Sequence, residues 1–153
     1  MALSLRPAIA QDFSVLFALD QACFAPGIAW SKAELQYFLR YPGNIGLVAQ
    51  DEPHQIAGFA IAGKQLRKGV IHGRLITIDV DPAQRRRGVG HLLLEETERL
   101  LRAGSATAVL LEVAVDNVTA QNFYEKHGYT RTGRIRGYYQ GRIDAFVMEK
   151  PLA

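Results

Sequence analysis

The sequence contains a single cysteine, Cys23, among its 153 residues, so no disulfide can form within the chain. A chain without disulfides favours an intracellular setting, where thiols stay reduced. Cys23 stands in an apolar stretch, which indicates a small packed side chain rather than a nucleophile.

Long apolar runs are also missing. No stretch approaches the ~20 consecutive apolar residues that cross a bilayer, and the opening segment MALSLRPAIAQDF lacks the apolar run of a signal peptide. We therefore expect a cytoplasmic protein without a membrane partner. His54, His72, His91 and His127 do not fall at the spacing of metal ligands, so we expect no metal.

Strong net charge is absent too. The formal charge of +3 fits an anionic ligand but is too small to indicate nucleic acid, and no aromatic residues interleave with the basic run. A length of 153 residues with 48% hydrophobic residues predicts one domain, residues 1–153, with its own core.

What the sequence does contain is an alternation of strand-like and helix-like patterns. We expect strands at residues 4–9, 45–50, 56–63, 74–80, 107–115, 129–139 and 142–150, with a turn at 51–54. We expect helices at residues 11–24, 31–40, 88–102 and 118–127, the second opened by a capping box of Ser31 and Glu34. This order predicts an α/β fold in which a mixed sheet has helices on both faces.

The segment RRRGVG, residues 85–90, lies in the turn between an expected strand and an expected helix. A helix N-terminus exposes unpaired N–H groups and a positive dipole end, which attract anions. Gly88 and Gly90 would let a ligand approach those N–H groups, and the arginines add donors. A solvated run of charges with incidental glycines explains the same letters equally well, and neither nucleotide-binding glycine pattern is present.

The expected strand followed by VDPAQRRRGVGHLLLEE resembles the acetyl-CoA-binding segment of the GCN5-related N-acetyltransferases, the GNAT family. Arg85, Gly88 and Gly90 fill the family signature [QR]-x-x-G-x-[GA]. The segments LEVAVDNVTAQNFYEKHGY, RIRGYY and DAFVMEK resemble the second half of the same fold, so the resemblance covers nearly the whole chain. It is greatest to the RimI-like branch, which acetylates protein N-termini.

The resemblance implies the GNAT fold, a mixed and mostly antiparallel sheet of about seven strands, and acetyl-CoA as co-substrate. It places the pantetheine arm along the backbone of one strand and the pyrophosphate in the arginine- and glycine-rich loop. The cofactor-binding residues that it implies are Ile78, Asp79, Val80, Arg85, Arg86, Arg87, Gly88, Val89, Gly90, His91 and Asn117. Asn117 is also a favourable helix N-cap, and both roles stay open.

Two side chains are candidates for acid–base chemistry. Glu112 interrupts the apolar strand LLEVAV, where a carboxylate destabilises the fold unless it is hydrated, paired or used. A solvated strand edge would explain it as well, but the resemblance makes Glu112 the general base. Tyr124 has the pattern of an ordinary core tyrosine, and the resemblance makes it the acid that protonates the leaving sulfur.

The substrate side is less defined. The resemblance places Trp30, Tyr138 and Tyr139 around the acceptor, and the sequence departs from the family at Ala29, where proline is usual, and at Asp79, where a small apolar residue is usual. The expected partner is a protein or peptide N-terminus, with ribosomal proteins among the candidates, bound by a monomer or weak homodimer. Acetylation of a small amine or a lysine, and a non-catalytic RNA- or ribosome-binding module, are the alternatives.

Overall fold

The computed structural model describes residues 2–52 and 54–152. Its helices and strands are β1 (Ser4–Pro7), α1 (Phe13–Cys23), α2 (Lys32–Arg40), β2 (Ile45–Asp51), β3 (Gln55–Arg67), β4 (Val70–Val80), α3 (Val89–Ala103), β5 (Ala108–Ala114), α4 (Val118–Lys126), β6 (Thr130–Tyr139) and β7 (Ile143–Pro151). Two short 3₁₀ turns, η1 (Ala10–Asp12) and η2 (Pro82–Gln84), precede α1 and α3. The order of elements confirms the expected α/β alternation.

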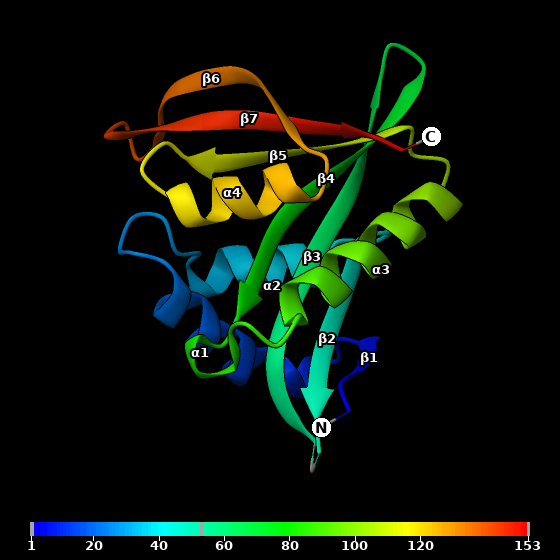
Figure 1. Ribbon diagram of the computed structural model, residues 1–153, viewed down its shortest axis with the longest axis vertical. Helices are drawn as coiled ribbons and strands as arrows, with labels where there is room; N and C mark the ends of the chain where they lie inside the picture. The colour runs from blue at the N-terminus through cyan, green and yellow to red at the C-terminus, as the bar shows by residue number, and fades with distance from the viewer. Residues whose placement is uncertain (1, 53, 153) are drawn as a thin grey trace.

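The strands form one seven-stranded sheet in the order β1-β2-β3-β4-β5-β7-β6 (Figure 1). Every neighbouring pair is antiparallel except β4 and β5, so the expected mixed sheet is confirmed. The parallel pair is short, because β4 meets β5 only where Gly73 lies opposite Val109 and Arg74 lies opposite Leu110. Beyond these residues the two strands diverge, and we call the space between them the β4–β5 gap.

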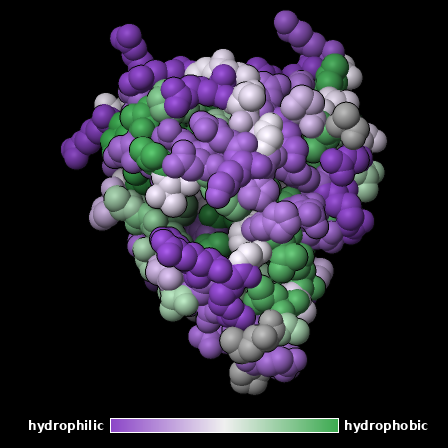
Figure 2. Space-filling view, in the orientation of Figure 1, coloured by the Kyte–Doolittle hydropathy of each residue, from purple (hydrophilic) through white to green (hydrophobic). Residues whose placement is uncertain are grey.

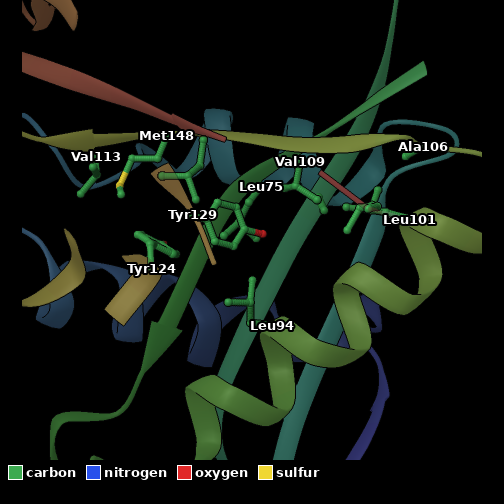
Figure 3. Packing of buried hydrophobic residues seen from close by; sticks show 12 residues of the cluster. Leu75, Leu94, Leu101, Ala106, Val109, Val113, Tyr124, Tyr129 and Met148 are labelled. Atoms are coloured by element: carbon green, nitrogen blue, oxygen red, sulfur yellow. The ribbon is translucent and has the colours of Figure 1, made fainter. Parts of the chain in front are cut away.

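The helices cover both faces of the sheet. Leu16 and Leu19 of α1 and Leu35 of α2 pack in one buried cluster with β2 and β3. On the other face, α3 packs over β2, β3 and β4 (Figure 1). Both α3 and α4 also share a buried cluster with β4, β5 and β7 that includes Leu94, Leu101 and Tyr124 (Figure 3). The β4–β5 gap therefore opens between two helical layers.

The β3–β4 hairpin is longer than the sequence predicted. The expected strands left residues 64–73 unassigned, whereas β3 continues to Arg67 and β4 begins at Val70. The turn between them uses positive φ angles of 52° at Lys68 and 78° at Gly69. Residues 64–67 are exposed, so they lack the buried-face pattern that would have marked a strand.

The remaining differences are small. The expected helix at 11–24 is divided into η1 and α1, and the helix expected to begin near Gly88 begins at Val89 with Gly88 as its N-cap. Pro53, in the expected turn at 51–54, lies outside the described residues. None of the helices described has the length and apolar content needed to span a membrane.

Candidate active site

The loop between β4 and α3 turns the chain sharply before the helix. Asp81 accepts a hydrogen bond from the Ala83 N–H at 3.0 Å, and Gly88 caps α3 with a φ of 78° and a ψ of 13°. The first intrahelical bond runs from the Leu92 N–H to the Gly88 carbonyl at 3.0 Å. The N–H groups of Val89, Gly90 and His91 therefore precede the helical ladder and remain available at the positive end of α3.

The two glycines of this loop have different physical roles. Gly88 needs the left-handed conformation, and a Cβ built there would meet nothing within 4 Å. A Cβ on Gly90 would instead lie 3.2 Å from the ring of Phe123 in α4. Gly88 thus shapes the turn beside open space, whereas Gly90 lets α3 pack closely against α4.

The three arginines of this loop, Arg85, Arg86 and Arg87, also differ in their surroundings. Arg87 donates to Asp51 of β2 at 3.4 Å and to Gln84, so it braces the loop against the sheet. Arg85 lies near Cys23. Arg86 has a positive φ of 68°, a strained conformation of the kind that gathers at ligand-binding loops.

Cys23 is held in place rather than activated. Its Sγ donates to the Val80 carbonyl at 3.3 Å. Burial raises the pKa of the Cys23 thiol to about 11, so the thiolate is disfavoured at neutral pH. This agrees with the packing role expected from the sequence.

The strand segment of Ile78, Asp79 and Val80 lies at the edge of the β4–β5 gap. On one side it pairs with β3, through Ala60, Phe59 and Gly58. On the other side β5 has already diverged, which leaves the β4 edge open for a strand-like ligand. The space-filling view shows a hollow with an apolar floor between α4 and the loop before α3 (Figure 2).

Glu112 lies on β5, where its side chain is 15% exposed. Its Oε1 accepts three hydrogen bonds, from Arg74 Nη2 at 2.7 Å, Arg74 Nε at 3.1 Å and the Tyr138 hydroxyl at 3.1 Å. These residues line a groove of about 460 Å³ that continues past Arg67 and Thr132. The carboxylate is therefore both paired and accessible, and the hydrogen bonds seen among the described residues leave Oε2 for a ligand or water.

Tyr124 lies on the other side of the sheet. Leu111 and Val113 of β5 pack in the cluster that contains Tyr124, and Glu112, between them in the strand, points to the opposite face. Burial raises the pKa of the Tyr124 hydroxyl, so it stays protonated at neutral pH. Glu112 and Tyr124 thus flank the β4–β5 gap from opposite faces.

The two consecutive tyrosines of β6 lie at the same site. Tyr138 contacts both Glu112 and Arg74, the latter donating to its hydroxyl at 2.9 Å. The ring of Tyr139 meets that of Tyr138 edge to face at 4.9 Å. Burial is the main cause that raises the pKa of each of these two hydroxyls.

The outer residues of the expected site have partners within the fold. Asn117 caps α4 by accepting the Ala120 N–H at 3.1 Å, which leaves its amide NH₂ free for another role. His91 in the first turn of α3 lies 2.9 Å from His127, the C-cap of α4, so this contact joins the start of α3 to the end of α4. Trp30 packs edge to face on Phe38 at 4.8 Å, in the segment that joins α1 and α2.

Two residues of the site were missed in the sequence. Arg74 holds Glu112, and its only sequence signal is a charge at the start of an apolar strand. Asp20 is fully buried and bonds to the Trp30 N–H at 2.6 Å. Its position four residues after Leu16 places it on the buried face of the helix, and this spacing could have identified Asp20 as a buried carboxyl group from the sequence. No group of three or more metal-ligating side chains occurs in residues 2–52 and 54–152.

Known proteins resemble the chain in sequence and in fold. A [ribosomal protein bS18]-alanine N-acetyltransferase of Salmonella typhimurium is 34% identical over 113 residues, covering 72% of this chain and 72% of that protein. The N-alpha-acetyltransferase RimI of Mycobacterium tuberculosis is 32% identical over 133 residues, covering 86% and 82%. A chain in the crystal structure of the NatC complex bound to Gag peptide and CoA has a TM-score of 0.87 at 23% identity, covering 100% of both chains, a likeness of fold.

The family comparison covers most of the site. The model described as the acetyltransferase (GNAT) family matches residues 13–129, which include the β4–α3 loop, Glu112 and Tyr124. Together with the fold and the relatives, this match shows that the chain belongs to the GNAT family of acetyltransferases.

Proposed function

We propose that this acetyltransferase moves the acetyl group of acetyl-CoA to the α-amine of a protein or peptide N-terminus. The observation that carries the proposal is the placement of Glu112 and Tyr124 on opposite faces of the sheet at the β4–β5 gap. A proton acceptor on one side and a protonated hydroxyl on the other suit direct attack of an amine on a thioester held between them.

The proposed cofactor site uses the open edge of β4 and the start of α3. The backbone of Ile78, Asp79 and Val80 would bind the pantetheine arm as an added strand. The N–H groups from Gly88 to His91, with Arg85 and Arg86 beside them, would bind the pyrophosphate. The left-handed turn at Gly88 and the unpaired β4 edge both fit this ligand. No step of this chemistry requires a metal, and the absence of one stays a prediction.

The proton path follows from the residues that flank the gap. The reaction forms a C–N bond between the amine and the acetyl carbon and breaks the C–S bond. Glu112 would take the amine proton on Oε2, through a water, while Arg74 and Tyr138 hold Oε1 in position. Tyr124 would give its proton to the departing sulfur and recover one afterwards. An N–H of β4 at the thioester carbonyl would stabilise the developing oxyanion.

The acceptor is the finer part of the proposal. An α-amine with a pKa of about 7.7–8.0 is neutral about a few hundredfold more often near pH 7.5 than a lysine with a pKa of about 10.4. A carboxylate base therefore has less proton removal to perform when the acceptor is an α-amine. The names of the Salmonella and Mycobacterium relatives support the same acceptor class, and Trp30, Tyr138 and Tyr139 would surround it. A ribosomal protein as substrate, a cytoplasmic location and a monomeric or weakly dimeric state stay predictions.

Kinetics of two matched pairs of variants test the roles of the two groups. Glu112→Gln and Tyr124→Phe should each lower kcat by about 10²- to 10⁴-fold and leave acetyl-CoA binding unchanged, because each removes a proton-transfer group and keeps the shape. Glu125→Gln and Tyr37→Phe make the same chemical changes at exposed positions and should keep wild-type kcat. Wild-type turnover in both active-site variants, measured where chemistry limits the rate, would show that this mechanism is wrong.

A further inference from the structure

Two buried carboxyl groups meet where α1 packs on β4. Asp20 is 0% exposed and Asp79 is 1% exposed. One oxygen of each has a partner, because Asp20 Oδ2 accepts the Trp30 N–H at 2.6 Å and Asp79 Oδ1 accepts the Thr77 hydroxyl at 2.6 Å. The other two oxygens, Asp20 Oδ1 and Asp79 Oδ2, have no donor among the described residues.

These two carboxyls cannot both be charged in this place. Isolated buried charges are strongly unfavourable, and two like charges side by side are worse. None of the ion pairs among residues 2–52 and 54–152 includes Asp20 or Asp79. The titratable groups that face the pair are Cys23 of α1 and Tyr124 of α4, near Asp79, and Glu34 of α2, near Asp20. Arg85 of the β4–α3 loop contacts Cys23.

One proton between the two carboxyls satisfies both orphan oxygens. Burial, followed by the hydrogen bond with Asp20, raises the pKa of Asp79 well above its usual value. Burial also raises the pKa of Asp20, but its hydrogen bonds from Asp79 and from the Trp30 N–H oppose that change. The proton therefore resides on Asp79, which donates to a charged Asp20.

The pair connects two parts of the site that are far apart in the sequence. Asp20 and its neighbour Gln21 hold the backbone of Trp30, Gln21 by donating to the Trp30 carbonyl at 2.9 Å. Trp30 ends the α1–α2 segment on the acceptor side. Asp79 belongs to the strand edge proposed to bind the pantetheine arm. The shared proton thus fastens the acceptor-side segment to the cofactor strand.

We propose that Asp79, as a neutral acid that donates to Asp20, is a positioning residue for the acceptor site of this enzyme. The proposal rests on the proposed function only where it names the acceptor. Loss of the shared proton leaves two negative charges in contact. Their repulsion pushes the α1–α2 segment away from β4 and displaces Trp30 on the acceptor side of the site. The small apolar residue usual at this position in the family could not form such a contact.

Peptide kinetics provide the first test. In the wild type, KM for a peptide should rise by roughly ten- to a hundredfold once alkaline pH removes the shared proton, the size expected for a lost bond to a charged group. KM for acetyl-CoA should change little. Asp79→Asn keeps a neutral hydrogen-bond donor that cannot ionise, so the peptide KM of this variant should not rise in this way at alkaline pH. Ionisation of the peptide amine is the same for both proteins and cancels in the comparison.

Spectroscopy tests the pair without any substrate, so it separates a failure of this proposal from a failure of the proposed function. Protein labelled with ¹³C-aspartate should show the infrared C=O stretch of a protonated carboxylic acid near neutral pH, and Asp79→Asn should lack it. Trp30 is the only tryptophan, so its fluorescence reports on the segment directly. Its emission should change at alkaline pH in the wild type and stay constant in Asp79→Asn.

Each outcome of these experiments either supports or overturns the proposed role of Asp79. The labelled band together with a pH-dependent peptide KM that Asp79→Asn abolishes would support the proposal. Absence of the band in the wild type would overturn it, even if the variant does not fold. A band with identical Trp30 and KM profiles in both proteins would overturn the positioning role.

Discussion

Two glycines with the same φ angle allow the proposed cofactor loop to be tested against a matched control. Gly88 in the loop and Gly69 in the β3–β4 turn both have a φ of 78°, and a Cβ at either would meet nothing within 4 Å. The only unfavourable effect of alanine at either position is therefore the left-handed backbone conformation, which costs about 1–2 kcal/mol per residue. We expect Gly88→Ala and Gly69→Ala to lower the free energy of unfolding by similar amounts in urea titrations.

The two variants should differ once acetyl-CoA is added. At about 100 times Kd, a ligand that binds only the native state adds about 2.7 kcal/mol to the free energy of unfolding. Gly69→Ala should keep this increment. Gly88→Ala shifts the N–H groups at the start of α3, and a tenfold weaker Kd at the same concentration would leave about 1.4 kcal/mol. Equal increments in both variants would refute the phosphate-binding role of this loop.

Three further predictions concern other residues. Arg74→Gln should lower kcat by up to about 10²-fold through misplacement of Glu112, with unchanged acetyl-CoA affinity in steady-state assays. Tyr129→Phe removes the 2.8 Å bond to the buried Glu98 carboxylate and should cost about 1.5–3 kcal/mol in urea unfolding. Because burial raises the pKa of Asp79 in the folded state, the contribution of Asp79 to wild-type stability is largest below the ordinary aspartate pKa. Wild-type stability should fall relative to Asp79→Asn by about 1.4 kcal/mol per pH unit until the folded pKa is passed. Parallel urea midpoints across that range would contradict it.

Much of the fold was readable from local patterns. The capping box predicted at Ser31 and Glu34 is present, with both of its hydrogen bonds. Buried strands and amphipathic helices follow hydrophobic periodicity, so their order was predictable. The exposed ends of β3 and β4 lack that periodicity, and the positive φ of Lys68 gives no compositional signal.

The site was only partly readable, because its side chains come from elements distant in the sequence. The loop around Gly88 was marked by its position before a helix. The contact of Arg74 with Glu112 spans 38 residues, and it depends on the parallel pairing of β4 with β5, which no local pattern encodes. The meeting of Asp20 with Asp79 depends likewise on how α1 packs on the sheet. The different roles of Gly88 and Gly90 required the position of Phe123.

The most direct test of the proposed reaction is to map where the acetyl group is placed. One peptide with a free α-amine and an internal lysine is incubated with the enzyme and acetyl-CoA, and its fragments are analysed by mass spectrometry over time. The first residue is varied across a panel, and Glu112→Gln serves as the catalytic control. We expect the acetyl group to appear first on the α-amine, and far more slowly with the variant. Acetylation that appears first on the lysine across the whole panel would contradict it.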